Sequence, residues 1–127
     1  EVLSTNPQII CDTAHNAHGL ARVAEQLEKV ECDKLYCVMG FCEDKDIKSI
    51  LALMPKKAHY IFTRATSRRA ATTESLAALA TELKLDFECC EDVKSAVEAA
   101  KSTMGTNDAL YIGGSTFVVA EVLDSTL

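Results

Sequence analysis

Glycine is scarce in this chain, and its glycines form no nucleotide-binding loop. The 127 residues include only five, Gly19, Gly40, Gly105, Gly113 and Gly114. Neither G-x-G-x-x-G nor G-x-x-x-x-G-K-[ST] can be built from them, which excludes the two common glycine-rich phosphate loops. We therefore expect that this chain alone has no cradle for the phosphates of a nucleotide.

Long hydrophobic runs and a concentrated basic surface are also missing. No apolar run approaches the roughly 20 residues that span a bilayer, and no basic segment followed by an apolar one indicates a signal peptide. The net charge is −6, and basic residues are scattered except around Arg64, Arg68 and Arg69. A nucleic-acid binder normally carries a basic face. We expect a cytoplasmic, globular protein that binds neither membrane nor nucleic acid.

The six cysteines form no C-x-x-C pair. Cys11, Cys37 and Cys89 lie in apolar, strand-like runs, where we expect reduced thiols buried as small hydrophobic groups. Adjacent Cys89 and Cys90 would point to opposite faces of a strand, so no metal site is predicted from them. There is also no G-x-S-x-G turn and no cysteine beside a histidine, so no nucleophilic catalyst is evident.

Short apolar runs alternate with amphipathic segments along the chain. The predicted strands are Gln8–Asp12, Lys34–Gly40, Ala58–Thr63, Asp86–Cys90 and Asp108–Gly113. Their near-continuous hydrophobicity is typical of parallel strands covered on both faces. Hydrophobic residues recur at helical spacing within Leu20–Val30, Ile47–Met54, Leu76–Leu83 and Val93–Met104, and a last helix is expected at about Thr116–Leu123.

This alternation predicts an α/β fold, a three-layer α/β/α sandwich with a mainly parallel sheet of five or six strands. Glu1–Leu3 would supply the sixth strand, pairing back on Gln8–Cys11 through a turn at Asn6-Pro7.

Polar residues and glycines follow the predicted strands where each strand ends. Ligands bind at this carboxyl edge in open α/β sheets. Asp12-Thr13-Ala14-His15-Asn16 places an acid, an imidazole and an amide before a helix, whose first N–H groups are unpaired. Gly113-Gly114-Ser115-Thr116 opens another helix and would attract an anion.

Each of these residues also has a purely structural interpretation. Ser115 and Asp46 are well placed as helix caps, and Asp12 is of a type common in caps and turns. Arg68 and Arg69 would lie in a solvated loop, as most arginines do. For Ser115, capping and anion binding can coexist.

Four segments together resemble one enzyme family. Asp12–Asn16 resembles the D-G-A-H-N-P segment that opens the C-terminal domain of folylpolyglutamate synthase/dihydrofolate synthase, a branch of the Mur ligase superfamily. Gly40 with Asp44-Lys45-Asp46 resembles the family's glycine and D-K-D element. Arg69-Ala70 resembles its R-A element, and Gly114-Ser115 its terminal G-S. All four occur in the family's order and cover nearly the whole chain.

Two residues of the first segment depart from the family pattern. Thr13 stands in place of a glycine, which is tolerable only if the position needs neither positive φ nor close approach of a ligand. Ala17 replaces a proline that is favoured but not required at a first helical position. The intact A-H-N is closer to the folate branch than to the Mur peptide ligases.

The resemblance implies a Rossmann-like fold of the Mur ligase C-terminal type. Residues 1–127 would be a single C-terminal domain, a fragment of a larger multidomain enzyme whose missing N-terminal part holds the P-loop. That enzyme would use ATP and Mg²⁺ to phosphorylate a carboxylate of folate or dihydropteroate, and the glutamate amine would attack the acyl phosphate. The fragment alone would bind none of these cofactors and would be inactive.

The resemblance also implies roles for individual residues. Asp12 would accept hydrogen bonds from the ATP ribose, His15 would face the phosphates or the incoming amino acid, and Asn16 would cap the helix. The implied contacts are Asp12, His15, Asn16 and Lys45 for ATP, and Ser115 and Arg69 for glutamate, with Asp12 and His15 as catalytic residues. A Mur-type peptide ligase domain and a non-catalytic nucleotide-binding module are the alternatives.

Overall fold

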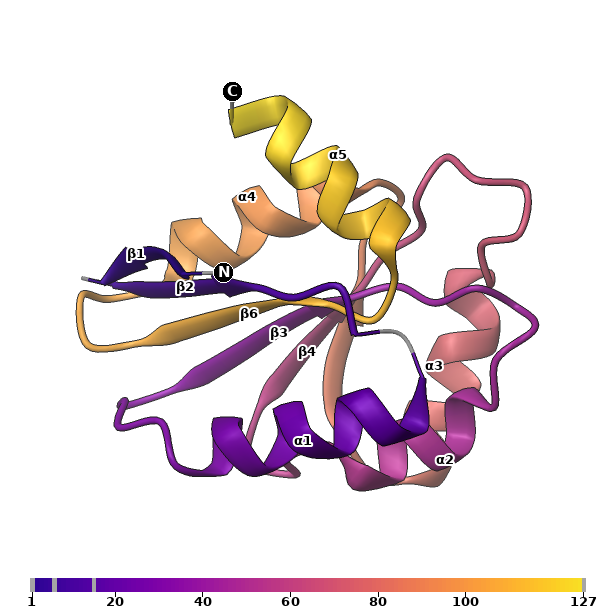
Figure 1. Ribbon diagram of the computed structural model, residues 1–127, viewed down its shortest axis with the longest axis horizontal. Coiled ribbons are helices and arrows are strands. Elements are labelled where there is room, and N and C mark those ends of the chain that lie inside the picture. The colour runs from indigo at the N-terminus through magenta and orange to yellow at the C-terminus, as the bar shows by residue number, and fades with distance from the viewer. Residues whose placement is uncertain (1, 6, 15, 127) are drawn as a thin grey trace.

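A computed structural model describes residues 2–5, 7–14 and 16–126 and shows one sheet between two layers of helices (Figure 1). The strands are β1 (Val2–Thr5), β2 (Gln8–Cys11), β3 (Leu35–Met39), β4 (His59–Phe62), β5 (Asp86–Cys89) and β6 (Ala109–Gly113). The helices are α1 (Ala17–Glu28), α2 (Ile47–Leu53), α3 (Thr73–Glu82), α4 (Val93–Thr103) and α5 (Thr116–Thr126). The predicted α/β sandwich is confirmed.

The sheet has the spatial order β1-β2-β6-β3-β4-β5. The five strands from β2 to β5 are parallel, and β1 runs antiparallel to β2. The predicted sixth strand is therefore confirmed, although it continues to Thr5; Asn6, in the predicted turn, lies outside the described residues. Because β6 lies between β2 and β3, the loops that follow these three strands become neighbours.

Helices cover both faces of the central strands. Leu20 of α1, Ile50 of α2 and Leu76 of α3 belong to the core on one face of the sheet. Ala96 of α4 and Val118 of α5 belong to the core on the other. Every residue of β3 and β6 is buried between these layers, as their continuous hydrophobicity predicted.

The edge strand β5 departs from the prediction of strands covered on both faces. Asp86, Glu88 and Cys89 are exposed, because β5 is the last strand of the sheet and pairs only with β4. The prediction that Cys89 is buried is therefore wrong, whereas Cys11 and Cys37 are buried as expected. His59 of β4 contacts both carboxylates, with Nδ1 2.8 Å from Asp86 and Nε2 2.7 Å from Glu88.

Side-chain caps begin four of the helices. The acceptors are Asn16 for α1, Asp46 for α2, Thr72 for α3 and Asp92 for α4. Each accepts a hydrogen bond from the backbone N–H three residues later, which satisfies one of the unpaired donors of the first turn. The capping interpretation of Asp46 is thus confirmed.

Candidate functional site

The polar loops predicted to share an edge do so, at the carboxyl ends of the parallel strands on the right of Figure 1. Main-chain hydrogen bonds join them. The N–H of Asp12 donates to the carbonyl of Ile112 at 3.1 Å, and the N–H of Gly40 donates to that of Gly113 at 3.4 Å. The edge is therefore a continuous surface built from the ends of β2, β6 and β3.

Glycines allow these loops to touch through their backbones. Gly114 has a φ of +90°, and a Cβ on it would lie 2.6 Å from the carbonyl oxygen of Gly40. A Cβ on Gly40 would lie 2.8 Å from the carbonyl oxygen of Thr63. Real Cβ atoms do not approach backbone oxygen so closely, so a side chain at either position would push the loops apart.

A pocket of about 240 Å³ lies at this contact. It is lined by Cys42, Lys45, Arg69, Gly114, Ser115, Thr116 and Phe117. The structure therefore brings together Lys45, Arg69 and Ser115, which come from three separate loops. Sequence reasoning did not include Phe117, which stays 43% exposed at the start of α5.

Ser115 caps α5 and is only 3% exposed. Its Oγ accepts a hydrogen bond from the N–H of Phe117 at 3.1 Å, and its carbonyl accepts one from the N–H of Val119. The capping interpretation is thus confirmed. Within the described residues the hydroxyl accepts but does not donate, so its hydrogen can serve a ligand in the pocket.

Arg69 is held by an ion pair that sequence reasoning missed. Its Nη2 donates to Oδ2 of Asp44 at 2.7 Å. Although partial desolvation opposes the shift, the hydrogen bond and charge of Arg69 lower the pKa of Asp44. Main-chain bonds align the two loops, since the N–H of Glu43 donates to the carbonyl of Arg69 at 2.7 Å. Exposed pairs of this kind contribute little stability, so a ligand carboxylate can replace Asp44 on the guanidinium.

Asp12 lines a separate pocket of about 200 Å³ with Cys11, Thr13, Val119 and Leu123. Its Oδ1 accepts a hydrogen bond from the N–H of Ala14 at 2.7 Å, which closes a tight turn ahead of α1. Thr13 is exposed and does not adopt a positive φ, so this position does not need glycine conformationally. Asn16 caps α1 as expected, whereas His15 lies outside the described residues.

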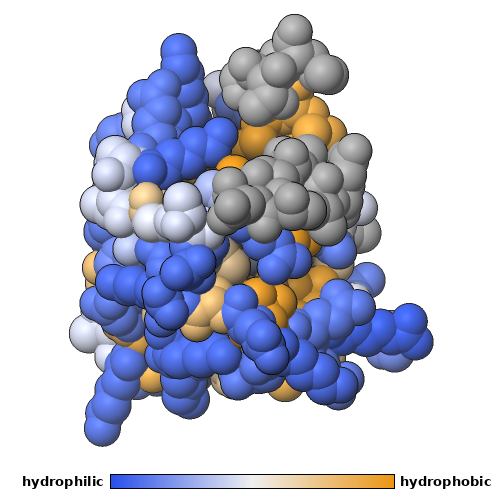
Figure 2. All heavy atoms as spheres, turned by 90° about the vertical axis from the view of Figure 1, so that its left-hand side faces the viewer, coloured by the Kyte–Doolittle hydropathy of each residue, from blue (hydrophilic) through white to orange (hydrophobic). Residues whose placement is uncertain are grey.

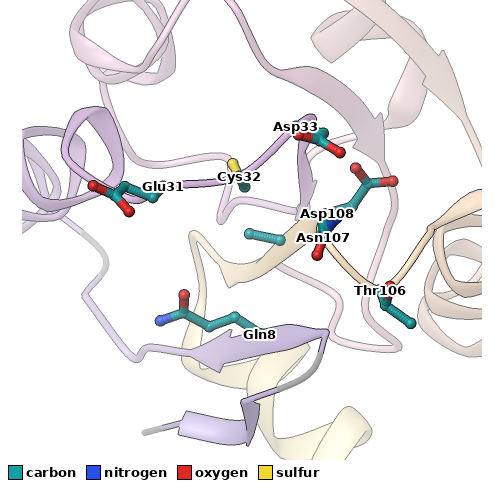
Figure 3. A pocket seen from close by; sticks show the side chains of 8 residues that line it. Gln8, Glu31, Cys32, Asp33, Thr106, Asn107 and Asp108 are labelled. Atoms are coloured by element: carbon teal, nitrogen blue, oxygen red, sulfur yellow. The ribbon is translucent and has the colours of Figure 1, made fainter.

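A larger pocket, of about 380 Å³, lies at the opposite edge of the sheet. It is bounded by Gln8 of β2, the segment 31–33 after α1 and the segment 106–109 leading into β6 (Figure 3). Figure 2 views the molecule from that edge and shows mainly hydrophilic side chains. Glu31, Asp33 and Asp108 give the pocket a negative lining that disfavours phosphates and carboxylates. The anion-binding features lie at the carboxyl edge instead.

The part of the chain that the structure describes lacks two further kinds of feature. No group of three or more His, Cys, Asp or Glu side chains there could hold a metal ion. No helix there is both long and apolar enough to cross a membrane.

Comparisons with known proteins identify the family of this chain. Residues 1–116 match the family model described as Mur ligase, glutamate ligase domain. A dihydrofolate synthase/folylpolyglutamate synthase of Buchnera aphidicola subsp. Schizaphis graminum is 25% identical over 126 residues, which are 97% of this chain and 29% of that protein.

Solved structures show the same fold. E. coli FolC in complex with ADP superimposes with a TM-score of 0.88 at 25% identity, over 99% of this chain and 30% of that one. A bifunctional folylpolyglutamate synthase/dihydrofolate synthase with Mn, AMPPNP and L-glutamate bound superimposes with a TM-score of 0.88 at 28% identity, over 99% of this chain and 30% of that one. The chain spans less than a third of the length of these relatives. It belongs to the family of Mur ligase glutamate ligase domains.

Proposed function

We propose that this chain is the C-terminal domain of an ATP-dependent ligase that adds glutamate to folate or dihydropteroate through an acyl phosphate. The observation that carries the proposal is the pocket at the start of α5, where Lys45, Arg69 and Ser115 converge beside the Asp12 turn. This pocket offers two cations, a hydroxyl and the positive end of a helix to an anionic ligand.

The nucleotide would lie against the loop of residues 12–16. The Asp12 carboxylate is fixed by the N–H of Ala14 through one oxygen, and it would accept a hydrogen bond from a ribose hydroxyl. Asn16 would hold the start of α1. Lys45, which lies in the neighbouring loop after β3, would face the negative charge of the nucleotide. His15 would face the phosphates or the incoming amino acid. That relatives are bound to ADP or AMPPNP supports a nucleotide as a ligand of the whole ligase.

The incoming glutamate would bind in the pocket of Arg69 and Ser115. One carboxylate of the glutamate would replace Asp44 as the partner of the Arg69 guanidinium. The Ser115 hydroxyl would donate a hydrogen bond to the ligand while its oxygen still caps α5. Catalysis in this class consists mainly of positioning and charge stabilisation. The part these residues play is to hold the amine of glutamate against the acyl phosphate.

The remaining parts of the reaction belong outside this chain. The described residues do not fit a Mg²⁺ site, because they offer no cluster of carboxylate or imidazole ligands; we place the metal, the P-loop and the pterin site in an N-terminal domain. The ligase would act in the cytoplasm. A G-x-x-x-x-G-K-[ST] sequence within the preceding ~300 residues, the length of two domains, would support this; its absence would favour a non-catalytic module.

Asp12→Ala in the full-length ligase tests the nucleotide side. We expect the KM for ATP to rise by about 10-fold, because a charge-assisted hydrogen bond is lost. Asp33→Ala is the matched control, since Asp33 is an exposed acid at the opposite edge. Unchanged ATP kinetics in Asp12→Ala would remove Asp12 from the site.

Ser115→Ala tests the glutamate side. We expect the KM for glutamate to rise more than the KM for ATP, and Ser115→Thr, which keeps the hydroxyl, to restore most of the difference. Ser102→Ala removes an exposed helical hydroxyl far from the pocket and should change neither constant. A larger effect on ATP than on glutamate would contradict the assignment.

A further inference from the structure

Tyr111 carries a buried hydroxyl that the proposed mechanism does not use. It lies in the middle of β6, is 1% exposed, and belongs to the core on the α1 face of the sheet. Within the described residues, its Oη has no hydrogen-bond partner. Buried polar groups are seldom left unpaired, so this hydroxyl needs an explanation.

The ring of Tyr111 extends along β6 toward the carboxyl edge. Gly113 is two residues ahead and on the same face of the strand, and a Cβ there would collide with the Tyr111 hydroxyl. The space that a side chain at 113 would fill is thus occupied by Oη. The neighbouring residue Ile112 accepts the hydrogen bond from the Asp12 N–H, which places the Asp12 turn beside this end of β6.

The electrostatic surroundings keep this hydroxyl protonated. Burial is the main cause that raises the pKa of Tyr111 far above its usual range, and the negative charge of Asp12 is the second cause. Tyr111 is therefore a neutral donor close to a carboxylate that sits at the proposed nucleotide site.

A second tyrosine shows what a purely structural hydroxyl does in this core. Tyr60 of β4 is also completely buried and on the same face, but its hydroxyl donates to the carbonyl of Pro55. A buried polar group that has no partner costs on the order of 1–3 kcal/mol. A phenylalanine would fill the place of Tyr111 without this cost. The described contacts therefore give the hydroxyl at 111 no structural role of the kind that Tyr60 has.

We propose that Tyr111 is a positioning residue of the nucleotide site, whose hydroxyl donates a hydrogen bond to the Asp12 carboxylate when the nucleotide binds. One Asp12 oxygen is already occupied by the N–H of Ala14. A hydrogen bond from Tyr111 to the Asp12 carboxylate would fix the orientation of that carboxylate toward the ribose. This inference rests on the proposed function, in which Asp12 contacts ATP.

Tyr111→Phe tests the inference, with Tyr60→Phe as the matched control. In urea unfolding of the 127-residue chain, we expect Tyr111→Phe to unfold at a midpoint no lower than wild type and Tyr60→Phe at a lower one. In the full-length ligase, Tyr111→Phe should raise the KM for ATP about 10-fold, with little change in kcat or in the KM for glutamate. In an Asp12→Ala background it should have no further effect.

Three results would overturn the inference. The first is a fall in unfolding midpoint for Tyr111→Phe as large as that for Tyr60→Phe, which would mean that the hydroxyl is already paired in the free chain. The second is an equal rise in the KM for ATP with and without Asp12, which would exclude action through that carboxylate. The third is an unchanged KM for ATP in Tyr111→Phe. If Asp12→Ala still raises it, the role of Asp12 in the proposed function stands and only the inference about Tyr111 fails; if neither variant raises it, Asp12 is removed from the nucleotide site and the inference fails with that assignment.

Discussion

Gly114→Ala is the substitution for which the structure makes its sharpest stability prediction. The residue connects β6 to α5 with a φ of +90°, a region that L-residues occupy at a cost of about 1–2 kcal/mol. The added Cβ would also lie 2.6 Å from the carbonyl oxygen of Gly40 and 3.1 Å from the Phe41 ring. The oxygen belongs to the backbone, so relief requires the two loops to separate.

Together these effects should lower the free energy of unfolding by at least about 2 kcal/mol. With a urea m-value of about 2 kcal/mol/M, the unfolding midpoint falls by about 1 M. Urea titration of the 127-residue chain, followed by circular dichroism, measures this shift directly.

Gly105→Ala is the matched control. Gly105 lies in an exposed turn without a positive φ, and a Cβ there would meet only Asp108 Oδ2, at 3.8 Å. Alanine at such a position changes stability slightly and often favourably, because it restricts the unfolded chain. Equal midpoints for Gly114→Ala and Gly105→Ala would refute the claim that the loops after β6 and β3 meet backbone to backbone at Gly114 and Gly40.

Other predictions concern the core and the helix caps. Leu76→Ala truncates a completely buried side chain and should lower the free energy of unfolding in urea by about 2–5 kcal/mol. Leu53→Ala, at a residue that is 47% exposed, should lower it far less. Similar losses for the two variants would contradict the assigned core. Asn16→Ala should lower the unfolding free energy by about 1 kcal/mol and Asn16→Asp should retain it, and a loss in both would exclude capping as the cause. The hydrogen bonds that Asp92 accepts from Ser95 lower its pKa below 3.8, so its stabilising contribution is present above that pH and is lost as the pH falls below it. Asp92→Asn should remove this part of the acid dependence in unfolding measured from pH 5 to pH 2, and an unchanged profile would count against the cap.

Much of the fold follows from local hydrophobic patterns. Leu35–Met39 is hydrophobic throughout, and the structure buries it on both faces as a central strand. Asp86-Phe87-Glu88 alternates polar and apolar residues, which is the pattern of a strand with one open face. The prediction grouped Asp86–Cys90 with the near-continuous apolar strands, so it missed the exposure of this strand and of Cys89.

The candidate site was harder to predict, because it depends on the order of strands in space. The sequence indicates that Lys45, Arg69 and Ser115 each follow a strand, but only the insertion of β6 beside β3 brings their loops around one pocket. The Arg69–Asp44 ion pair depends in the same way on an isolated antiparallel bridge between Cys42 and Ala70. Neither contact leaves a trace in local periodicity.

The exposed edge of β5 also bears on how copies of this chain meet. An open edge offers unpaired main-chain groups to any further strand, including the β5 of a second copy. Two β5 strands in contact would bring Asp86 and Glu88 of each copy toward those of the other, with one histidine per copy to balance them. We therefore expect the acidic side chains on this strand to disfavour edge-to-edge aggregation. Neutralising them should lower the solubility of the protein more than its free energy of unfolding.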